Sequence, residues 1–153
     1  MTAVGVRPAT EADGDALADL RREWTEEQAG GPIDDPGYEQ RMADWLTRTA
    51  ADSRTWVAVL GGKPIGLLHV ALLERMPRPG HPPSRWGYVT SLYVRPPHRD
   101  GGVGRRLLDE LLAYARDAGL RRVVLHPSDR AVPFYERAGF APASALMMRG
   151  PVA

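Results

Sequence analysis

The chain has 153 residues, of which 43% are hydrophobic and 25% charged, and its formal net charge at pH 7 is +1. This length predicts one domain, residues 1–153, and the near balance of charge favours neither nucleic acid nor a membrane as a partner. The chain has no cysteine, which excludes disulfides, thiolate metal sites and a cysteine nucleophile, and it has no signal-like or membrane-spanning apolar run, so we expect a cytoplasmic protein.

The first half of the chain predicts strands and helices from the spacing of its apolar residues. The predicted elements are a strand at residues 4–7, a helix capped by Thr10 or Asp13 and ended by Gly30, a helix over 38–49, and a hairpin of two strands at 54–60 and 65–73. Residues 74–85 contain four prolines and no periodicity, so they are predicted to form a loop.

The second half alternates strands with helices. It predicts a strand at 86–94, a helix that begins near Val103 or Gly104, a strand at 121–126, a short helix that includes 134–136 and ends at Gly139, and a last strand at 143–149. Because strand, helix and strand follow one another, strands 86–94 and 121–126 should be parallel, with a right-handed crossover. The complete order predicts an α/β fold with a mixed sheet flanked by helices on both faces.

The turn before the helix at Val103 has the features of an anion site. Residues 99–105 read Arg-Asp-Gly-Gly-Val-Gly-Arg. Glycines allow positive φ and a close approach of the backbone, and the N–H groups of a first helical turn favour a phosphate. A P-loop is excluded because Lys63 is the only lysine, and a dinucleotide fingerprint is excluded because Leu107 stands where its third glycine is needed.

The remaining pattern, Arg99-x-x-Gly102-x-Gly104 at the start of a helix, resembles the acyl-CoA pyrophosphate loop of the GCN5-related N-acetyltransferases, the GNAT superfamily. Taken alone it also fits a glycine-rich turn with an N-terminal helix cap. Residues 125–140 resemble the closing motif of the same family, which consists here of Ser128, Ala131, Tyr135, Gly139 and Phe140. The resemblance covers essentially the whole chain and implies the GNAT fold, with about six or seven strands.

The resemblance implies direct transfer of acetyl from acetyl-CoA to a primary amine in a ternary complex, without a metal. Tyr135 is the implied general acid for the leaving thiolate, and its alternative role is that of a core tyrosine. The pantetheine arm is expected to bond like an extra strand to residues 92–94, where a backbone N–H polarises the carbonyl. The implied cofactor-binding residues are Leu92, Tyr93, Val94, Arg99, Asp100, Gly101, Gly102, Val103, Gly104, Arg105 and Ser128.

The general base is left open. Many relatives carry a glutamate on the strand before the loop, but strand 86–94 has no carboxylate. Either water deprotonates the amine, or Glu23 or Glu27 reaches in from the first helix. Ser128 contacts CoA or water, or only caps a helix. His69, His98 and His126 lack the spacing of metal ligands and are interpreted as structural.

Charge is the only guide to the acceptor. No arginine or lysine interrupts residues 23–39, whose carboxylates are Glu23, Glu26, Glu27, Asp34, Asp35 and Glu39. A negative rim there predicts a cationic acceptor, and the alternative is a solvated helix end. Arg75, Arg78 and Arg85 would favour an anionic acceptor if the proline-rich loop covers the site. A non-catalytic acyl-CoA sensor is the alternative function, and a homodimer is left open.

Overall fold

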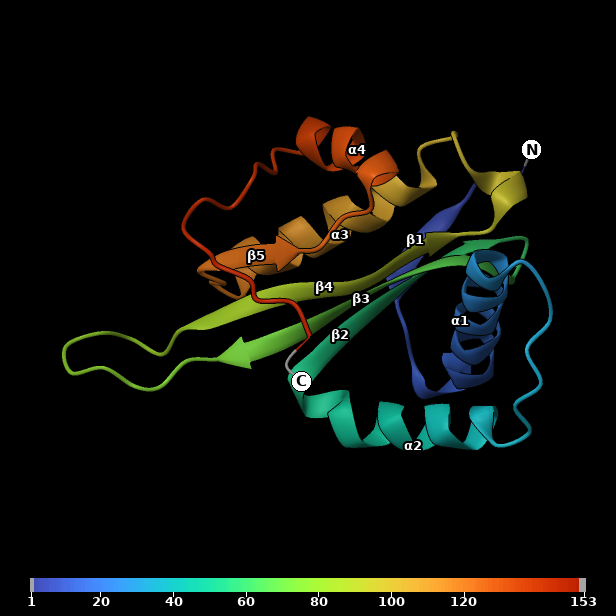
Figure 1. Ribbon diagram of the computed structural model, residues 1–153, viewed down its shortest axis with the longest axis horizontal. Helices are drawn as coiled ribbons and strands as arrows, with labels where there is room; N and C mark the ends of the chain where they lie inside the picture. Colours follow the sequence, from blue (N-terminus) through green and yellow to red (C-terminus); the bar gives the residue numbers. More distant parts are fainter. Residues whose placement is uncertain (1, 152–153) are drawn as a thin grey trace.

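The computed structural model describes residues 2–151, which form a mixed sheet with helices on both faces (Figure 1). Residue 1 and residues 152–153, which belong to the predicted domain, lie outside the described residues. The strands are β1 (Gly5–Pro8), β2 (Ser53–Leu60), β3 (Lys63–Glu74), β4 (Arg85–Val94) and β5 (Arg122–Leu125). The main helices are α1 (Gly14–Ala29), α2 (Tyr38–Thr49), α3 (Val103–Asp117) and α4 (Val132–Arg137).

The strands lie in the sheet in the order in which they occur in the chain. Neighbours from β1 to β4 are antiparallel, whereas β4 and β5 are parallel, which confirms the pairing predicted from the strand, helix and strand order. Helices α3 and α4 cover one face, and α1 and α2 cover the other (Figure 1). The sheet therefore separates two cores, each filled by alternate side chains of the same strands.

The predicted strand at 143–149 is wrong, and with it the prediction of six or seven strands. Among residues 2–151 the sheet has five strands, and the segment after α4 is irregular. Backbone bonds from Ser144 N to Pro142 O and from Leu146 N to Ala143 O bend its start, and Met147 is fully exposed. An apolar run acquires strand structure only where it can pair and pack, and this run does neither.

Strand β4 contains a β-bulge that decides where the sheet opens. His69 of β3 pairs with Ser91, but the next residue, Val70, pairs with Val89, so Thr90 is an extra residue in β4. β5 pairs with β4 only from Trp86 to Val89. Bulges bend a strand and increase its twist, which explains why β5 diverges there. Within the part of the chain that the structure describes, no strand pairs with residues 90–94 on the side toward β5.

Candidate active site

The open edge of β4 contains the residues predicted to bond the pantetheine arm. Tyr93 is 5% exposed and its ring stacks on Trp24 of α1, with 5.9 Å between centroids. Leu92 and Val94 pack instead against the core on the α3 side. Their side chains are thus committed to packing on the two faces of the sheet. What this edge offers to a ligand is backbone N–H and C=O groups, as a strand-like ligand requires.

The glycine-rich turn leads into α3 as predicted, since the helix begins at Val103. Only one of its three glycines has positive φ: Gly102, at 86°, while Asp100 also takes a left-handed conformation with φ of 63°. These two residues turn the chain so that it enters α3 at once. The first N–H groups of α3 therefore lie at the end of β4, where helix geometry favours a phosphate.

A cavity of about 530 Å³ lies beside this turn, between α3 and α4. Seven of the predicted cofactor-binding residues line it: Val94, Arg99, Asp100, Gly102, Val103, Gly104 and Arg105. Leu92, Tyr93, Gly101 and Ser128 do not. His98, Phe134 and Arg137 also line the cavity and were not predicted. Arginine and histidine side chains with helix N–H groups make this cavity suited to an anion.

Arg99 is held beside the loop by helix α1. Its guanidinium donates to both carboxylate oxygens of Glu27, at 2.9 and 2.8 Å, and its Nε donates to the Val94 carbonyl at 2.8 Å. Hydrogen bonding to Arg99 lowers the pKa of Glu27. Arg95 makes a similar two-point contact with Glu23, at 2.8 and 2.9 Å. Both glutamates considered as a base are therefore occupied by arginine, which argues against that role.

Tyr135 lies in the core rather than on the wall of the loop cavity. It is 9% exposed, and its ring packs edge-on against Phe134 and Phe140, with centroids 5.0 and 5.6 Å away. It lines a separate cavity of about 290 Å³ between β5, α4 and the segment after α4. Burial raises the pKa of Tyr135, so its hydroxyl keeps its proton at neutral pH. Its role as the general acid stays a prediction.

Ser128 does not cap a helix through its side chain. It precedes a short 3-10 turn at Asp129–Ala131, but its hydroxyl makes no capping hydrogen bond. The residue is exposed. Its hydroxyl is accordingly available to a ligand or to water, and a contact with CoA remains a prediction.

A second cavity, of about 400 Å³, lies between helices α1 and α2 and the sheet. Its lining comes from four side-chain groups: apolar (Leu17, Met42, Leu46, Leu67), aromatic (Tyr38, Trp45), arginine (Arg21, Arg41) and hydroxyl or imidazole (Thr55, His69, Thr90, Ser91). Thr90 and Ser91 lie at the bulge, where the part of β4 that does not pair with β5 begins. This cavity therefore lies at one end of the open edge of β4, and the glycine-rich turn follows the other end.

His69 is a titratable group at the bulge, where it pairs with Ser91. It is 5% exposed, its Nδ1 lies 2.8 Å from Thr55 Oγ1, and its ring packs against Trp45 at 4.9 Å. Burial lowers its pKa from 6.5 to about 4, so the imidazole is neutral at pH 7. The sequence marked His69 as structural; the structure also places it on the wall of the second cavity.

Tyr38, one of the residues that line the second cavity, has an unusual hydroxyl. Its Oη is buried and has no hydrogen-bond partner among residues 2–151. Burial also raises the pKa of this tyrosine. A buried hydroxyl without a partner is costly and rare in a folded protein.

Arginine side chains neutralise most of the acidic segment, residues 23–39, which runs from the second half of α1 to the start of α2. Five of its six carboxylates form ion pairs with arginines: Glu23 with Arg95, Glu26 and Glu39 with Arg22, Glu27 with Arg99, and Asp35 with Arg41. The proline-rich loop does not cover this side, because it joins the far end of β3 to the start of β4 (Figure 1). Neither feature therefore supplies the charged rim predicted from sequence.

Two negative findings concern residues 2–151. No group of three or more histidine, aspartate or glutamate side chains in this range is arranged to hold a metal ion. None of the helices in the same range is both long and apolar enough to cross a membrane.

A model of the acetyltransferase (GNAT) family matches residues 16–140. The chain belongs to this family. An aminoglycoside N(6')-acetyltransferase from Stenotrophomonas maltophilia is 33% identical over 144 residues, 86% of each chain. A glucosamine 6-phosphate N-acetyltransferase from Trypanosoma brucei brucei is 26% identical over 99 residues, so the match spans 65% of that relative and 65% of this chain.

Solved structures of GNAT proteins share the fold over nearly the whole chain. A GCN5-related N-acetyltransferase from Ralstonia eutropha JMP134 superposes with a TM-score of 0.76 and 28% identity, covering 98% of this chain and 99% of that one. A predicted acetyltransferase from Clostridium acetobutylicum, solved with acetyl-CoA, gives 0.77 at 19% identity, covering 97% and 96%. These likenesses confirm the GNAT fold.

Proposed function

We propose that the protein transfers the acetyl group of acetyl-CoA to a primary amine, directly and in a ternary complex. The observation that carries this proposal is the placement of the two cavities at the two ends of the open edge of β4. Thr90 and Ser91 line one cavity and Val94 lines the other. Val94 is four positions after Thr90 in the strand, a span of about 13 Å. This arrangement suits an extended pantetheine arm that reaches from a phosphate-binding site to an amine-binding site.

In this proposal the pyrophosphate binds the first N–H groups of α3 and the Arg99 and Arg105 side chains. The pantetheine arm bonds to the backbone of residues 92–94. A backbone N–H of β4 near the bulge donates a hydrogen bond to the thioester oxygen and so stabilises the negative charge that develops there. The amine nitrogen attacks the carbonyl carbon, a C–N bond forms, and the C–S bond breaks. Tyr135 gives its proton to the departing sulfur, and the nitrogen loses one proton as it becomes an amide; this proton passes through water and restores the Tyr135 hydroxyl.

The attacking amine must first lose a proton. Glu23 and Glu27 are paired with Arg95 and Arg99, and a carboxylate so paired is a weaker base. His69 is neutral at pH 7, but with a pKa of about 4 it is also a weak base. We therefore propose that the proton passes to water in the second cavity, one of the two routes left open by the sequence.

The acceptor is proposed to occupy the second cavity. A cationic acceptor, as the sequence predicts, would need a negative wall, yet the carboxylates of residues 23–39 are mostly paired and Arg21 and Arg41 face this cavity. The geometry favours an amine with an apolar or aromatic body. Its far end would carry an oxygen that accepts a hydrogen bond from Tyr38 and faces Arg21. The cationic acceptor stays as the competing prediction.

Release of free thiol tests the activity directly. The protein is incubated with acetyl-CoA and a panel of amines that have cationic, neutral aromatic and carboxylate-bearing bodies, and acetylated products are identified by mass spectrometry. Thiol release that depends on both an amine and the protein is expected. Acetyl-CoA binding without release for any amine would support the alternative, a sensor that binds acyl-CoA without turnover.

A further inference from the structure

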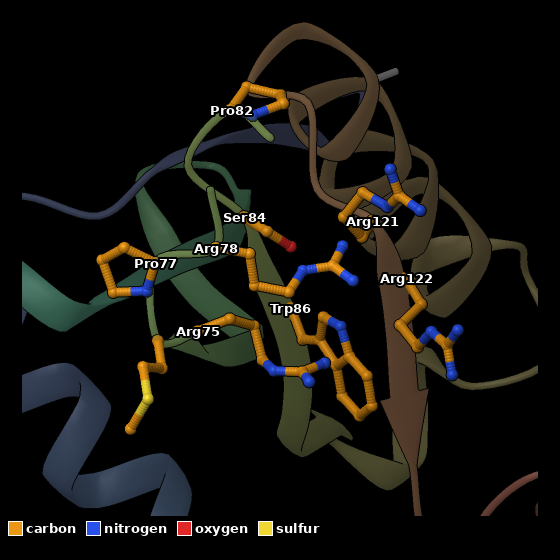
Figure 2. Close-up of a pocket in the computed structure, with 9 residues that line it drawn as sticks. Arg75, Pro77, Arg78, Pro82, Ser84, Trp86, Arg121 and Arg122 are labelled. Carbon is orange, nitrogen blue, oxygen red and sulfur yellow. The ribbon is translucent and has the colours of Figure 1, made fainter. Parts of the chain in front are cut away.

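A basic pocket of about 230 Å³ lies beside the loop between β3 and β4 (Figure 2). This loop is at the end of the sheet remote from the start of α3 (Figure 1). The pocket is formed by this loop and by the start of β5. Four arginines line it, together with Trp86 and parts of the loop: Arg75, Arg78, Arg121 and Arg122, with Met76, Pro77, Pro82 and Ser84. We call this set the arginine pocket. No step of the proposed acetyl transfer uses it.

The positive charge of the arginine pocket is not compensated by the protein. None of its four arginines forms an ion pair with a carboxylate among residues 2–151, whereas Arg7, Arg22, Arg41, Arg95, Arg99 and Arg105 all do so elsewhere. The whole chain carries a net charge of only +1. The four guanidinium groups are exposed, so solvent and salt screen their mutual repulsion, and a bound anion would offset what remains of it.

Two of the guanidinium groups are positioned by Trp86. Arg75 lies over the Trp86 ring at 4.9 Å and Arg122 at 4.6 Å. Arg122 is the direct neighbour of Trp86 across the β4–β5 pair, so sheet register fixes the contact. The base of the loop is closed by a bond of 2.9 Å from Arg75 N to Ser84 O. Arginines held in this way lose less side-chain entropy when they bind a ligand.

Figure 2 shows how the side chains converge. Arg75 and Arg78 extend from the loop across the pocket toward Trp86, and Arg121 and Arg122 lie on the opposite wall. Planar guanidinium groups on two walls match the oxygens of a phosphate, which accept two hydrogen bonds from each fork. The pocket is smaller than about 300 Å³, which is the lower end of the range for pockets that bind complete drug-sized ligands. The pocket therefore has room for a phosphate group and few further atoms.

From this geometry we propose that the arginine pocket binds the phosphate group of a small phosphate ester or pyrophosphate, at a site separate from the CoA loop. Arg78 and Arg122 supply the principal contacts from the two walls, and Trp86 is the platform that orients the second of them. The ligand lies at the start of β4, four residues before the bulge at Thr90, or about 13 Å along the strand. This proposal does not depend on the acetyltransferase activity.

Pyrophosphate is the probe, and the protein is first saturated with CoA so that the loop site is filled. Binding is followed by calorimetry and by tryptophan fluorescence. The double variant Arg78→Gln/Arg122→Gln removes one contact from each wall, and Arg48→Gln/Arg116→Gln removes two exposed arginines elsewhere with the same change of charge. We expect affinity to fall about tenfold or more in the first variant and to stay within about twofold in the control.

The fluorescence response gives a second readout. Trp86→Phe should abolish the change in emission while leaving calorimetric binding measurable. Equal affinity in wild type and both double variants, or no pyrophosphate binding by the wild type, would overturn the proposal. So would binding of an oligonucleotide without binding of pyrophosphate, because that would indicate a nucleic-acid surface. If CoA itself does not bind, the titration is repeated on Gly102→Glu, which keeps this test separate from the proposed function.

Discussion

Glu27 and Arg99 connect helix α1 to the glycine-rich turn before α3 through two hydrogen bonds of 2.9 and 2.8 Å. The pair joins two segments that are 72 residues apart in the chain. Both side chains are more than a third exposed, so the pair is expected to add at most about 1 kcal/mol to stability. Its more specific effect is to position Arg99 and to keep the Glu27 carboxylate away from the reaction.

The first prediction follows from that pair. Glu27→Gln should lower kcat by less than about threefold, because a carboxylate engaged by arginine does not deprotonate the amine. Glu23→Gln, which alters the corresponding pair with Arg95, should behave in the same way. A general base contributes typically about a hundredfold to ten-thousandfold. A loss of that size in kcat for either variant, with the fold intact, would show that the substituted glutamate acts as the general base.

The second prediction concerns Gly102. Its φ of 86° suits glycine and is tolerated by asparagine, and a Cβ at this position would meet no atom within 4 Å. Gly102→Glu places a carboxylate where the phosphate is proposed to bind, so acetyl-CoA affinity should collapse. Gly102→Asn, the neutral control, should bind more tightly than the glutamate variant. Unchanged affinity of a folded Gly102→Glu protein in calorimetry would refute the loop as the CoA site.

The third prediction tests Tyr135 as the acid. Tyr135→Phe keeps the ring and its contacts with Phe134 and Phe140, so folding and CoA affinity should change little. Loss of the hydroxyl should lower kcat about a hundredfold or more if it protonates the thiolate. Rates are measured with an acceptor identified from the amine panel. Equal kcat in both proteins would assign Tyr135 to the core alone.

The fourth prediction is a pH dependence of stability that comes from His69. Its pKa is 6.5 when unfolded and about 4 when folded, so between these values the unfolded chain binds more protons. The free energy of unfolding should therefore fall as the pH falls through this window, by about 1.4 kcal/mol per unit and about 3 kcal/mol in all. This contribution becomes constant about one unit above pH 6.5.

Urea unfolding between pH 6.5 and 5.5 measures this slope, because the ordinary pKa of glutamate is 4.5, a full unit below that window. His69→Gln should remove the slope, whatever its effect on overall stability. His126→Gln, at an exposed histidine, is the matched control and should retain it. An unchanged slope in His69→Gln would show that another group is responsible.

The fifth prediction distinguishes the two kinds of acceptor. Without an acceptor, Tyr38→Phe should stabilise the protein slightly, because it removes a buried hydroxyl that has no partner. With an acceptor that bonds this hydroxyl, the same change should raise KM about threefold to tenfold. Arg21→Gln should raise KM only for acceptors with an anionic end.

A cationic acceptor would give a different pattern. In that case kcat/KM should fall with ionic strength and in Glu26→Gln/Glu27→Gln, and Arg21→Gln should leave KM unchanged or lower it. The amine panel therefore distinguishes an acceptor with a cationic body from one with an uncharged or anionic body.

The fold could be predicted to a large extent because periodicity marks each element on its own. The apolar spacing of Leu107, Leu108 and Leu111 fixed the face of α3, and all three are fully buried. The same reasoning failed at residues 143–149, where an apolar run has no strand to pair with. The bulge at Thr90 was not predicted either, since the alternation in β4 gives no sign of an extra residue.

The site was predicted where its signals are local and missed where they are tertiary. Residues 99–105 are contiguous in the chain, so the sequence alone indicated an anion site beside them. His98, Phe134 and Arg137 reach that cavity from separate segments. Tyr38, Trp45 and His69 meet in the second cavity only because α2 packs beside β3. The neutralisation of the acidic segment also depends on arginines distant in sequence, such as Arg95 and Arg99.

The central claim is that acetyl-CoA lies along the open edge of β4, with its phosphates at the start of α3. Amide hydrogen exchange with and without acetyl-CoA tests this most directly, because it reads backbone N–H groups at both places. Slower exchange is predicted in peptides that cover residues 90–94 and 99–105, with no change at residues 63–70 of the neighbouring strand. Saturating acetyl-CoA that protects neither of the first two segments would contradict the account.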